Sequence, residues 1–241
     1  MKPKRTEITS DDLKSSATLS DLPSLLDVLK LLESSTLSRL LDLGCGYGGL
    51  TMFLANRLGI DDVYGVDINE ERLSQARARG IITHKIDLEK EKLPFPCDFF
   101  DIVTCFGSLE HLSYFDNFFS ESFRVLRKGG YLLISMPNLG SYVNRIGLLL
   151  GFQPRDVEIL RREPAQGFLP GNVRQWLGHV HSATLRAMKY AIGSYGFTIV
   201  KVRGSSPHTV PARLVRVLDK IFGTHAGLSR RFIILSQKPG L

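Results

Sequence analysis

The sequence predicts an α/β fold in which helices cover both faces of a doubly wound, mostly parallel sheet. Short aliphatic runs alternate with segments of helical periodicity through most of the 241 residues, a pattern typical of parallel strands joined by right-handed crossover helices. A glycine-rich turn, residues 44–49, directly follows the first of these runs, as in many folds of this class. With 43% hydrophobic residues and 22 glycines, the composition fits a single domain over residues 1–241.

Each element follows from a local pattern. Leucines recur at helical spacing from Leu22 to Leu32, which predicts an amphipathic helix within a helical N-terminal segment (residues 1–35), and we expect this helix to pack beside the ligand site. Aliphatic runs predict strands, and the periodic segments between them predict helices. The strands are expected at 39–43, 62–66, 81–86, 100–105, 131–136, 197–203 and 232–236, and the further helices at 49–57, 69–79, 117–127 and 182–195.

The turn after the first strand has the chemistry of a small-molecule site. Gly44 and Gly46 lack a Cβ, so the backbone can turn tightly and a ligand can lie against it. Gly44, Gly46 and Gly49 also fit the G-x-G-x-x-G pattern of dinucleotide sites, so spacing alone does not identify the ligand. Asp42 favours S-adenosylmethionine (SAM), because a carboxylate just before the turn attracts the amine of its methionine moiety and repels a pyrophosphate.

Two further acids are expected at the carboxyl ends of neighbouring strands. Asp67 ends the second strand, where its carboxylate could accept hydrogen bonds from both ribose hydroxyls of SAM or of NAD. Asp87 follows the third strand, where a side-chain oxygen could accept from the adenine amine, and Ile68 or Leu88 could cover the ring. Because Asp is also common at helix N-termini, each acid has a purely structural alternative.

Five motifs carry a resemblance to a known family. They are residues 41–46 (LDLGCG), 65–67 (GVD), 87–88 (DL), 100–103 (FDIV) running to 109–112 (LEHL), and 124–130 (RVLRKGG). As a set, over roughly residues 36 to 203, they resemble class I SAM-dependent methyltransferases of the methyltransferase-11/23 type. The resemblance implies a seven-stranded sheet with an antiparallel last strand, SAM as cofactor and S-adenosylhomocysteine as its product. It also implies that Cys45 and Phe106 contact the cofactor and that His111 lies near the reacting methyl.

A shorter stretch offers a second, local resemblance. Residues 135–140 (SMPNLG), with Asn144 and Arg145 nearby, resemble the W-type proteins of methionine biosynthesis, whose role is tied to an acyltransferase partner. This resemblance implies an alternative in which the chain binds SAM without catalysis and regulates a partner enzyme. A third alternative, an NAD-dependent oxidoreductase, predicts a second phosphate site at the glycine turn.

Between residues 139 and 181, the strand–helix alternation gives way to sequence rich in Gly, Pro and Arg that is too long for an ordinary connection. We expect an insertion that forms either a lid over the methyl-accepting side or a small helical cap that only protects the sheet. As a lid, it could line an apolar acceptor pocket with Phe152, Phe168, Leu169 and Trp176.

The net charge of +7 is distributed unevenly along the chain. Residues 139–241 hold 15 Lys and Arg against 4 Asp and Glu, whereas residues 1–138 hold 16 against 20. A basic second half suggests an anionic acceptor or partner surface, although dispersed basic residues more often form a solvated face. Nucleic acid is disfavoured but left open, because no dense basic stripe with aromatics is present. We expect a small-molecule acceptor, anionic or partly apolar, and a protein partner stays in consideration.

Methyl transfer requires an acceptor held in line with the S–CH3 bond in a dry site, and a base only where the acceptor must lose a proton. His111 is the candidate base, with a structural histidine as the alternative reading. His179 and His181 form an H-x-H pair, but no carboxylate or cysteine lies beside them in sequence, so no metal site is expected. The expected reaction is methyl transfer from SAM to oxygen or nitrogen of a small molecule.

The cysteines indicate the redox environment. Cys45, Cys97 and Cys105 form no C-x-x-C pair, and we expect three buried free thiols in a reducing cytoplasm. The sequence has no apolar run of about 20 residues, so no membrane span is expected.

Overall fold

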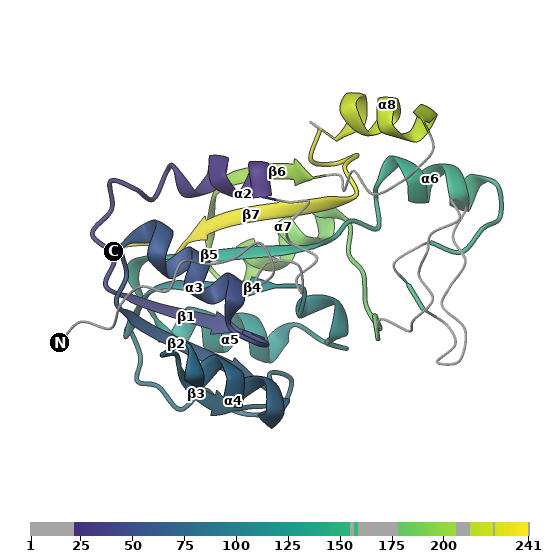
Figure 1. Cartoon of the computed structure of the whole chain (residues 1–241). Helices are drawn as coiled ribbons and strands as arrows, with labels where there is room; N and C mark the ends of the chain where they lie inside the picture. Colours follow the sequence, from purple (N-terminus) through teal and green to yellow (C-terminus); the bar gives the residue numbers. More distant parts are fainter. Residues whose placement is uncertain (1–21, 155–156, 159–177, 206–212, 224, 241) are drawn as a thin grey trace.

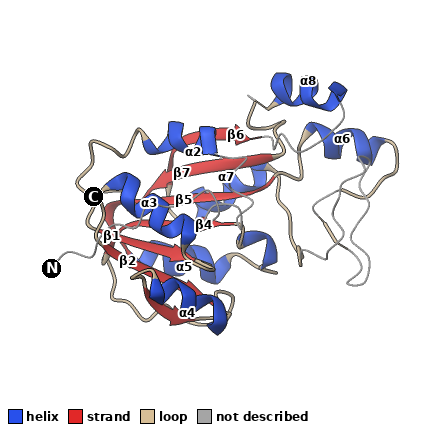
Figure 2. Ribbon diagram, viewed as in Figure 1, coloured by secondary structure: helices blue, strands red, loops and turns tan. Residues whose placement is uncertain are grey.

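A single sheet of seven strands forms the centre of the computed structural model, which describes residues 22–154, 157–158, 178–205, 213–223 and 225–240. The strands are β1 (Arg39–Leu43), β2 (Asp62–Asp67), β3 (Ile82–Lys85), β4 (Phe100–Phe106), β5 (Leu126–Pro137), β6 (Thr198–Ser205) and β7 (Arg231–Gln237). Their order across the sheet is β3-β2-β1-β4-β5-β7-β6 (Figures 1 and 2). β7 runs antiparallel to both of its neighbours, and the other strands are parallel to one another. The strand order switches between β1 and β4: the chain builds the sheet outward in one direction from β1 and in the other from β4. Such folds bind ligands at the carboxyl ends of the strands beside this switch point.

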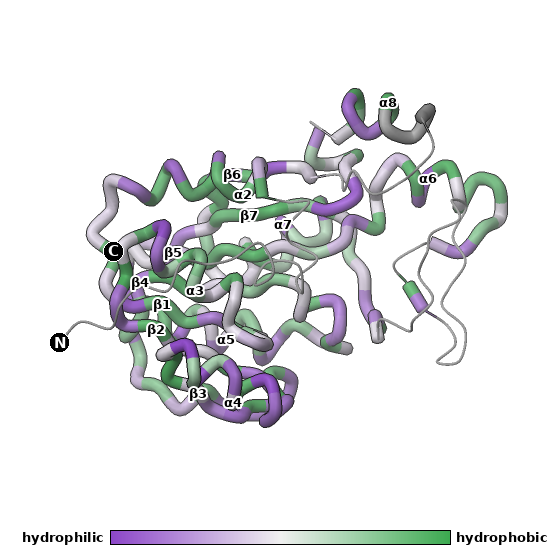
Figure 3. The backbone as a smooth tube through the Cα atoms, viewed as in Figure 1, coloured by the Kyte–Doolittle hydropathy of each residue, from purple (hydrophilic) through white to green (hydrophobic). Residues whose placement is uncertain are grey.

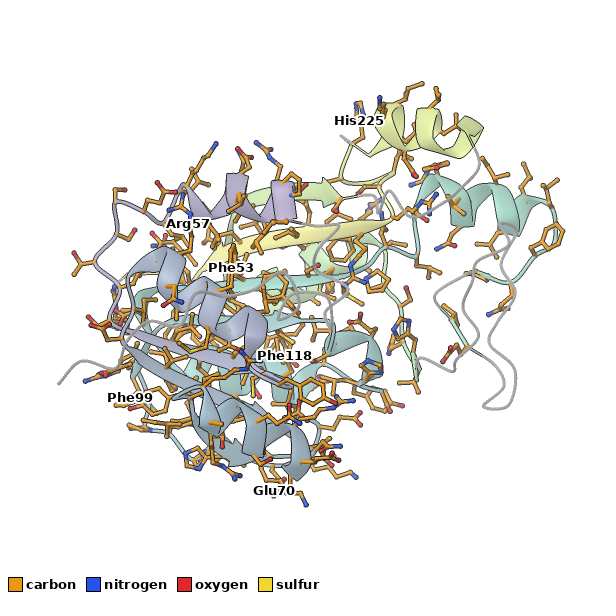
Figure 4. The ribbon with its side chains drawn as sticks, in the orientation of Figure 1. Phe53, Arg57, Glu70, Phe99, Phe118 and His225 are labelled. Carbon is orange, nitrogen blue, oxygen red and sulfur yellow. The ribbon has the colours of Figure 1, made fainter. Side chains whose placement is uncertain are left out.

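Helices cover both faces of the sheet and enclose two apolar clusters. They are α2 (Leu22–Leu29), α3 (Gly49–Leu58) and α4 (Glu70–Ala78) on one face, and α5 (Asp116–Val125) and α7 (Leu185–Ser194) on the other. Leu25 and Leu54 belong to the first cluster, and Phe118 and Ile192 to the second. In Figure 4, Phe53 and Phe118 mark these two clusters. A sheet buried on both faces explains why its strands read as nearly continuous apolar runs.

The predicted fold class is confirmed. Every predicted strand and helix corresponds to an observed element, and most bounds differ by no more than a few residues. β2, for example, is predicted at 62–66 and observed at Asp62–Asp67. The largest difference is β5, which is predicted to begin at residue 131 and begins at Leu126. Leu126 pairs with Phe100 ahead of an irregularity in the β4–β5 register, so the strand starts before the glycines that the sequence suggests as its boundary.

The predicted position of the N-terminal helix is wrong. α2 does not lie beside the glycine turn but packs over β6 and β7, where Ser24 Oγ donates to the carbonyl oxygen of Gly204 at 2.8 Å and Asp27 pairs with Arg203. Its apolar face, which includes the fully buried Leu25, covers the part of the sheet farthest in sequence from the turn. Residues 1–21 of the predicted helical segment lie outside the described residues.

Two helices that the sequence analysis did not predict extend beyond the carboxyl ends of the parallel strands (Figure 1). α6 (Tyr142–Leu149) follows β5 and lies inside the predicted 139–181 insertion, and α8 (Arg213–Phe222) connects β6 to β7. Much of the insertion, including Phe168, Leu169 and Trp176, lies outside the described residues. Among the helices that are described, none has the length and apolar character needed to cross a membrane.

Candidate active site

The glycine turn leads from β1 to α3, and hydrogen bonds hold it against the carboxyl end of β2. Gly44 has a φ of 80°, in the left-handed region, and its N–H and that of Cys45 both donate to the carbonyl oxygen of Val66, at 2.8 and 2.9 Å. Ser108, in the loop after β4, lies directly against the turn: a Cβ built on Gly44 would stand 2.0 Å from Ser108 Oγ. The position therefore requires glycine both for its backbone conformation and for the close approach of a second loop.

Asp67 lies at the end of β2 with only 7% of its surface exposed. Its Oδ2 accepts the N–H of Gly46 at 3.0 Å, and its Oδ1 accepts the N–H of Asn69 at 2.9 Å. A carboxylate offers about four acceptor positions, so each oxygen keeps capacity for a ligand hydroxyl. The next residue, Ile68, is 62% exposed and places apolar surface beside this carboxylate. The ribose and adenine contacts predicted for Asp67 and Ile68 fit this arrangement and stay predictions.

Asp42 lies inside β1 rather than beyond its end, and it is almost fully buried. Its two oxygens accept from the hydroxyl groups of Thr51 in α3, at 2.5 Å, and of Thr104 in β4, at 2.7 Å. Burial raises the pKa of Asp42 to about 6, because removing the carboxylate from water outweighs the two hydrogen bonds that favour its charged form. In this structure, Asp42 ties three elements together beneath the turn, and its predicted contact with a ligand amine stays a prediction.

Asp87 and Leu88 lie past the end of β3 and have mainly local contacts. The N–H of Asp87 donates to Glu91 Oε2 at 2.6 Å, and its side chain accepts the N–H of Glu89 and pairs with Lys90 at 3.3 Å. The carbonyl oxygen of Leu88 accepts a hydrogen bond from Asn117. The half-buried side chain of Leu88 packs against the apolar cluster beneath α5 and α7. The structural alternative for Asp87 is thus realised, and the predicted adenine contacts would have to be made in addition.

Cys45 and Phe106 lie near the same edge of the sheet. Cys45 is buried against Gly65, where an added Cβ would stand 2.6 Å from its Sγ, and burial raises the pKa of the Cys45 thiol. Phe106 ends β4 and is half-buried. Of the three cysteines, Cys45 and Cys105 are buried free thiols as expected, whereas the expectation of burial is wrong for Cys97, which is exposed.

A short segment crosses the carboxyl ends of β4 and β5, and we call it the strap (residues 178–183). It is held by η2 (Leu109–His111), the single-turn helix after β4, because the carbonyl oxygen of Glu110 accepts the N–H groups of Val180 and His181 at 3.0 and 3.2 Å. At its other end, Ala183 accepts the N–H of Leu139, just after β5, at 3.1 Å. The strap brings the H-x-H pair of the sequence next to the candidate base.

His111 is exposed, and the strap orients its ring. Its Nδ1 lies 2.9 Å from the carbonyl oxygen of Gly178. Since a carbonyl can only accept, the neutral ring carries its proton on Nδ1, and Nε2 keeps its lone pair. The ring of His179 stands edge-on to it, with 5.2 Å between centroids, and His181 makes the corresponding Nδ1 contact with the carbonyl oxygen of Ser113 at 2.9 Å. In the neutral ring, Nε2 is therefore the nitrogen that could accept a proton, and the role of His111 as base stays a prediction.

Sequence reasoning missed several residues that shape this edge. Thr51, Thr104 and Ser108 carry the hydroxyl groups that contact Asp42 and the glycine turn, and Arg231 pairs with the buried Glu110 at 3.5 Å. Thr104 has no local signal, because its register opposite Asp42 follows only from the order of β1 and β4. Thr51 lies in the first turn of the helix after the glycines, and that position is the one signal that could have indicated a contact with the turn.

Comparison with known proteins identifies the class of this site. Residues 41–134 match the family model of a methyltransferase domain. The whole fold is similar to the crystal structure of a SAM-dependent methyltransferase from Mesorhizobium loti, with a TM-score of 0.63 and 22% identity over 90% of this chain and 97% of that one. Residues 41–134 are thus similar to a methyltransferase domain, and the fold of the chain is that of SAM-dependent methyltransferases. SAM is the cofactor that this similarity implies, and the similarity favours SAM over the dinucleotide alternative.

Two further similarities concern acceptors and partners. The ubiquinone/menaquinone biosynthesis C-methyltransferase UbiE of Burkholderia mallei is 35% identical over 101 residues, which cover 40% of this chain and 42% of that protein. The methyltransferase-fold partner of the Haloferax volcanii Trm112 methyltransferase activator, solved in complex with it, is 14% identical with a TM-score of 0.60, over 92% of this chain and 96% of that one. The first match spans well under half of either chain, and the second shows the fold alone.

The raised pKa of Asp42 predicts a pH dependence for the stability of this protein. The folded chain holds the Asp42 proton up to about pH 6, whereas the unfolded chain releases it near 3.8, so stability falls as pH rises through that window. The rise in pKa corresponds to about 3 kcal/mol. Urea unfolding of the wild type and of Asp42→Asn gives the difference between their free energies of unfolding at each pH. We expect this difference to decrease by up to about 3 kcal/mol as pH rises from 3.8 to about 6. A difference that is constant or increases with pH would contradict the assignment.

Proposed function

We propose that this protein transfers the methyl group of SAM to oxygen or nitrogen of a small-molecule acceptor, releasing S-adenosylhomocysteine, with His111 as the general base. The observation that supports a catalytic role is the contact between His111 Nδ1 and the carbonyl oxygen of Gly178. This contact leaves Nε2 as the proton acceptor on an exposed ring after β4.

The residues of the turn are suited to hold the cofactor. Asp67 has acceptor capacity for the ribose hydroxyls, Ile68 provides exposed apolar surface for the adenine, and Gly46 leaves open space where a Cβ would stand. Asp42 adds negative charge beneath the turn, which favours the methionine amine. Bound SAM supplies an activated methyl on a sulfonium, so the chain itself needs only to orient the acceptor and accept its proton.

The acceptor side is formed by η2 and the strap, with three histidine rings around one edge. An acceptor that carries a hydroxyl or a protonated amine would need a base there, and His111 can serve as one. The name of the Burkholderia mallei relative points to carbon of a quinone precursor as another acceptor. We propose oxygen or nitrogen because that similarity spans 40% of this chain, whereas the histidine arrangement belongs to this chain.

Substitution of His111 tests this assignment. With methyl-labelled SAM and a panel of phenols, carboxylates and amines, His111→Ala is expected to slow transfer by on the order of 10²-fold, because the acceptor proton loses its acceptor. SAM affinity, measured by titration calorimetry, should stay unchanged.

The control is His84→Ala, which removes a histidine on β3, away from η2 and the strap. It should leave transfer unaffected. Full activity in His111→Ala would show that His111 is structural. Normal SAM binding without transfer to any acceptor of the panel by the wild type would instead favour the regulatory alternative, in which the chain binds SAM and acts on a partner enzyme.

A further inference from the structure

α6 and α8 pack against each other through a buried polar contact, and we call residues 142–152 and 213–223 the α6–α8 lobe. Tyr142 Oη donates to Asp219 Oδ1 at 2.8 Å, and the ring of Tyr142 packs against Phe222 with 5.1 Å between centroids. Arg230 Nε donates to the same Asp219 oxygen at 2.9 Å. These contacts join the two helices, which lie beyond the carboxyl ends of the parallel strands (Figure 1).

The outer side of the lobe is unusually apolar for an exposed surface. Leu149 is 86% exposed, and Leu148 and Leu150 on either side of it are 54% and 55% exposed. The hydropathy view shows this run as a continuous hydrophobic stretch (Figure 3). Among the described side chains, the exposed apolar ones are Ile146, Leu148, Leu149, Leu150 and Phe152 in α6 and just after it, and Val217 and Ile221 on α8. Clustered exposed side chains of this size mark an interaction surface rather than ordinary solvent-facing residues.

Among the described side chains of the lobe, the exposed charges are positive. Residues 139–154 contain no Asp or Glu, and the only acid in α8 is Asp219, which is 4% exposed and paired with Arg230. Exposed cations lie beside the apolar residues, with Arg145 on α6 and Lys220 on α8. Protruding apolar side chains with cations beside them are complementary to a surface with an apolar interior and anionic headgroups. A protein surface of matching shape would more often be expected to meet charges of both signs.

We propose that the α6–α8 lobe docks this protein on an anionic lipid surface. The apolar side chains at the end of α6 enter the headgroup boundary, and the cations contact lipid phosphates. Because β5 leads directly into α6, docking holds the carboxyl edge of the sheet, with η2 and the strap, close to the lipid. The inference goes beyond the proposed function and rests on no property of the cofactor site, so lipid binding and methyl transfer can fail separately.

Flotation with vesicles tests the proposal on the full chain. We expect the protein to float with vesicles of phosphatidylcholine and phosphatidylglycerol, and to bind vesicles of phosphatidylcholine alone at least about tenfold more weakly. Raising the salt from about 0.1 M to about 0.5 M should weaken binding, since it screens the attraction of the cations. Equal binding to neutral and anionic vesicles, or none to either, would overturn the proposal.

Two substitutions identify the surface. Leu149→Ser combined with Leu150→Ser should lower vesicle binding by at least about tenfold, because it removes the residues that enter the lipid. Tyr190→Ser is the matched control, since Tyr190 is 80% exposed on α7, outside the lobe, and it should bind vesicles as the wild type does. A wild type that is dimeric in light scattering, with a monomeric Leu149→Ser/Leu150→Ser variant and no vesicle binding, would assign the surface to a second copy instead. Retained vesicle binding in the double variant would also contradict the proposal.

Discussion

Replacing Gly44 with alanine is expected to destabilise the fold by about 2–5 kcal/mol and to lower SAM affinity by at least about tenfold. The left-handed conformation of Gly44 costs a residue with a Cβ about 1–2 kcal/mol, and the overlap with Ser108 adds about 1–3 kcal/mol. The loop after β4 must move to make room for the alanine side chain. This movement also displaces the surface against which the cofactor would lie. Urea unfolding measures the first effect, and titration calorimetry with SAM measures the second.

A matched control separates the two causes. Gly59 ends α3 with a φ of 71°, and an added Cβ there would meet no atom within 4 Å. Gly59→Ala should therefore show the conformational cost alone and leave SAM binding intact. Adding Ser108→Gly to Gly44→Ala should restore part of the stability, since it removes both overlapping side-chain atoms. If Gly44→Ala behaves like Gly59→Ala in both measurements, the contact between the two loops does not determine the site.

Asp67→Ala is expected to weaken SAM binding by more than about tenfold. The substitution removes the acceptor for the Gly46 N–H, which ties the glycine turn to β2, and it removes the carboxylate proposed to hold the ribose hydroxyls. Asp67→Asn should give an intermediate loss, because its single carbonyl oxygen can still accept. Calorimetry with SAM and with S-adenosylhomocysteine should show the same loss, since the two share the ribose.

The control for this prediction lies on the same strand. Asp62 begins β2 at the opposite edge of the sheet and pairs only loosely with Arg39, at 3.7 Å on the surface. Asp62→Ala removes the same charge and should leave the affinity for SAM unchanged. Unchanged affinity in Asp67→Ala would place the ribose elsewhere.

The parallel part of the sheet could be predicted because each strand is buried on both faces. β1 sends Leu40 into one cluster and Leu41 into the other, so the strand reads as an apolar run that only Asp42 interrupts. The acids at the strand ends could be located for the same reason, since Asp67 immediately follows such a run. The local pattern and the global fold agree here, and the prediction needed no long-range contact.

The α6–α8 lobe and the strap could not be predicted, because long-range contacts determine them. α6 has a local signal, since Ser141 caps its first turn through the N–H of Asn144, but the flanking Gly and Leu residues obscure its periodicity. The strap has no regular structure, and its position depends on the hydrogen bonds that the N–H groups of Val180 and His181 donate to the carbonyl oxygen of Glu110. The burial of Asp42 depends in the same way on Thr104, which only the sheet order brings beside it.

Titration calorimetry with SAM, S-adenosylhomocysteine and NAD, on the wild type and on Asp67→Ala, tests the central claim most directly. The claim is that the glycine turn and Asp67 form a SAM site, and it predicts that both sulfur ligands bind the wild type, that NAD gives no heat, and that Asp67→Ala weakens the two sulfur ligands alike. Binding of NAD in place of SAM, or SAM binding that does not respond to Asp67→Ala, would contradict it.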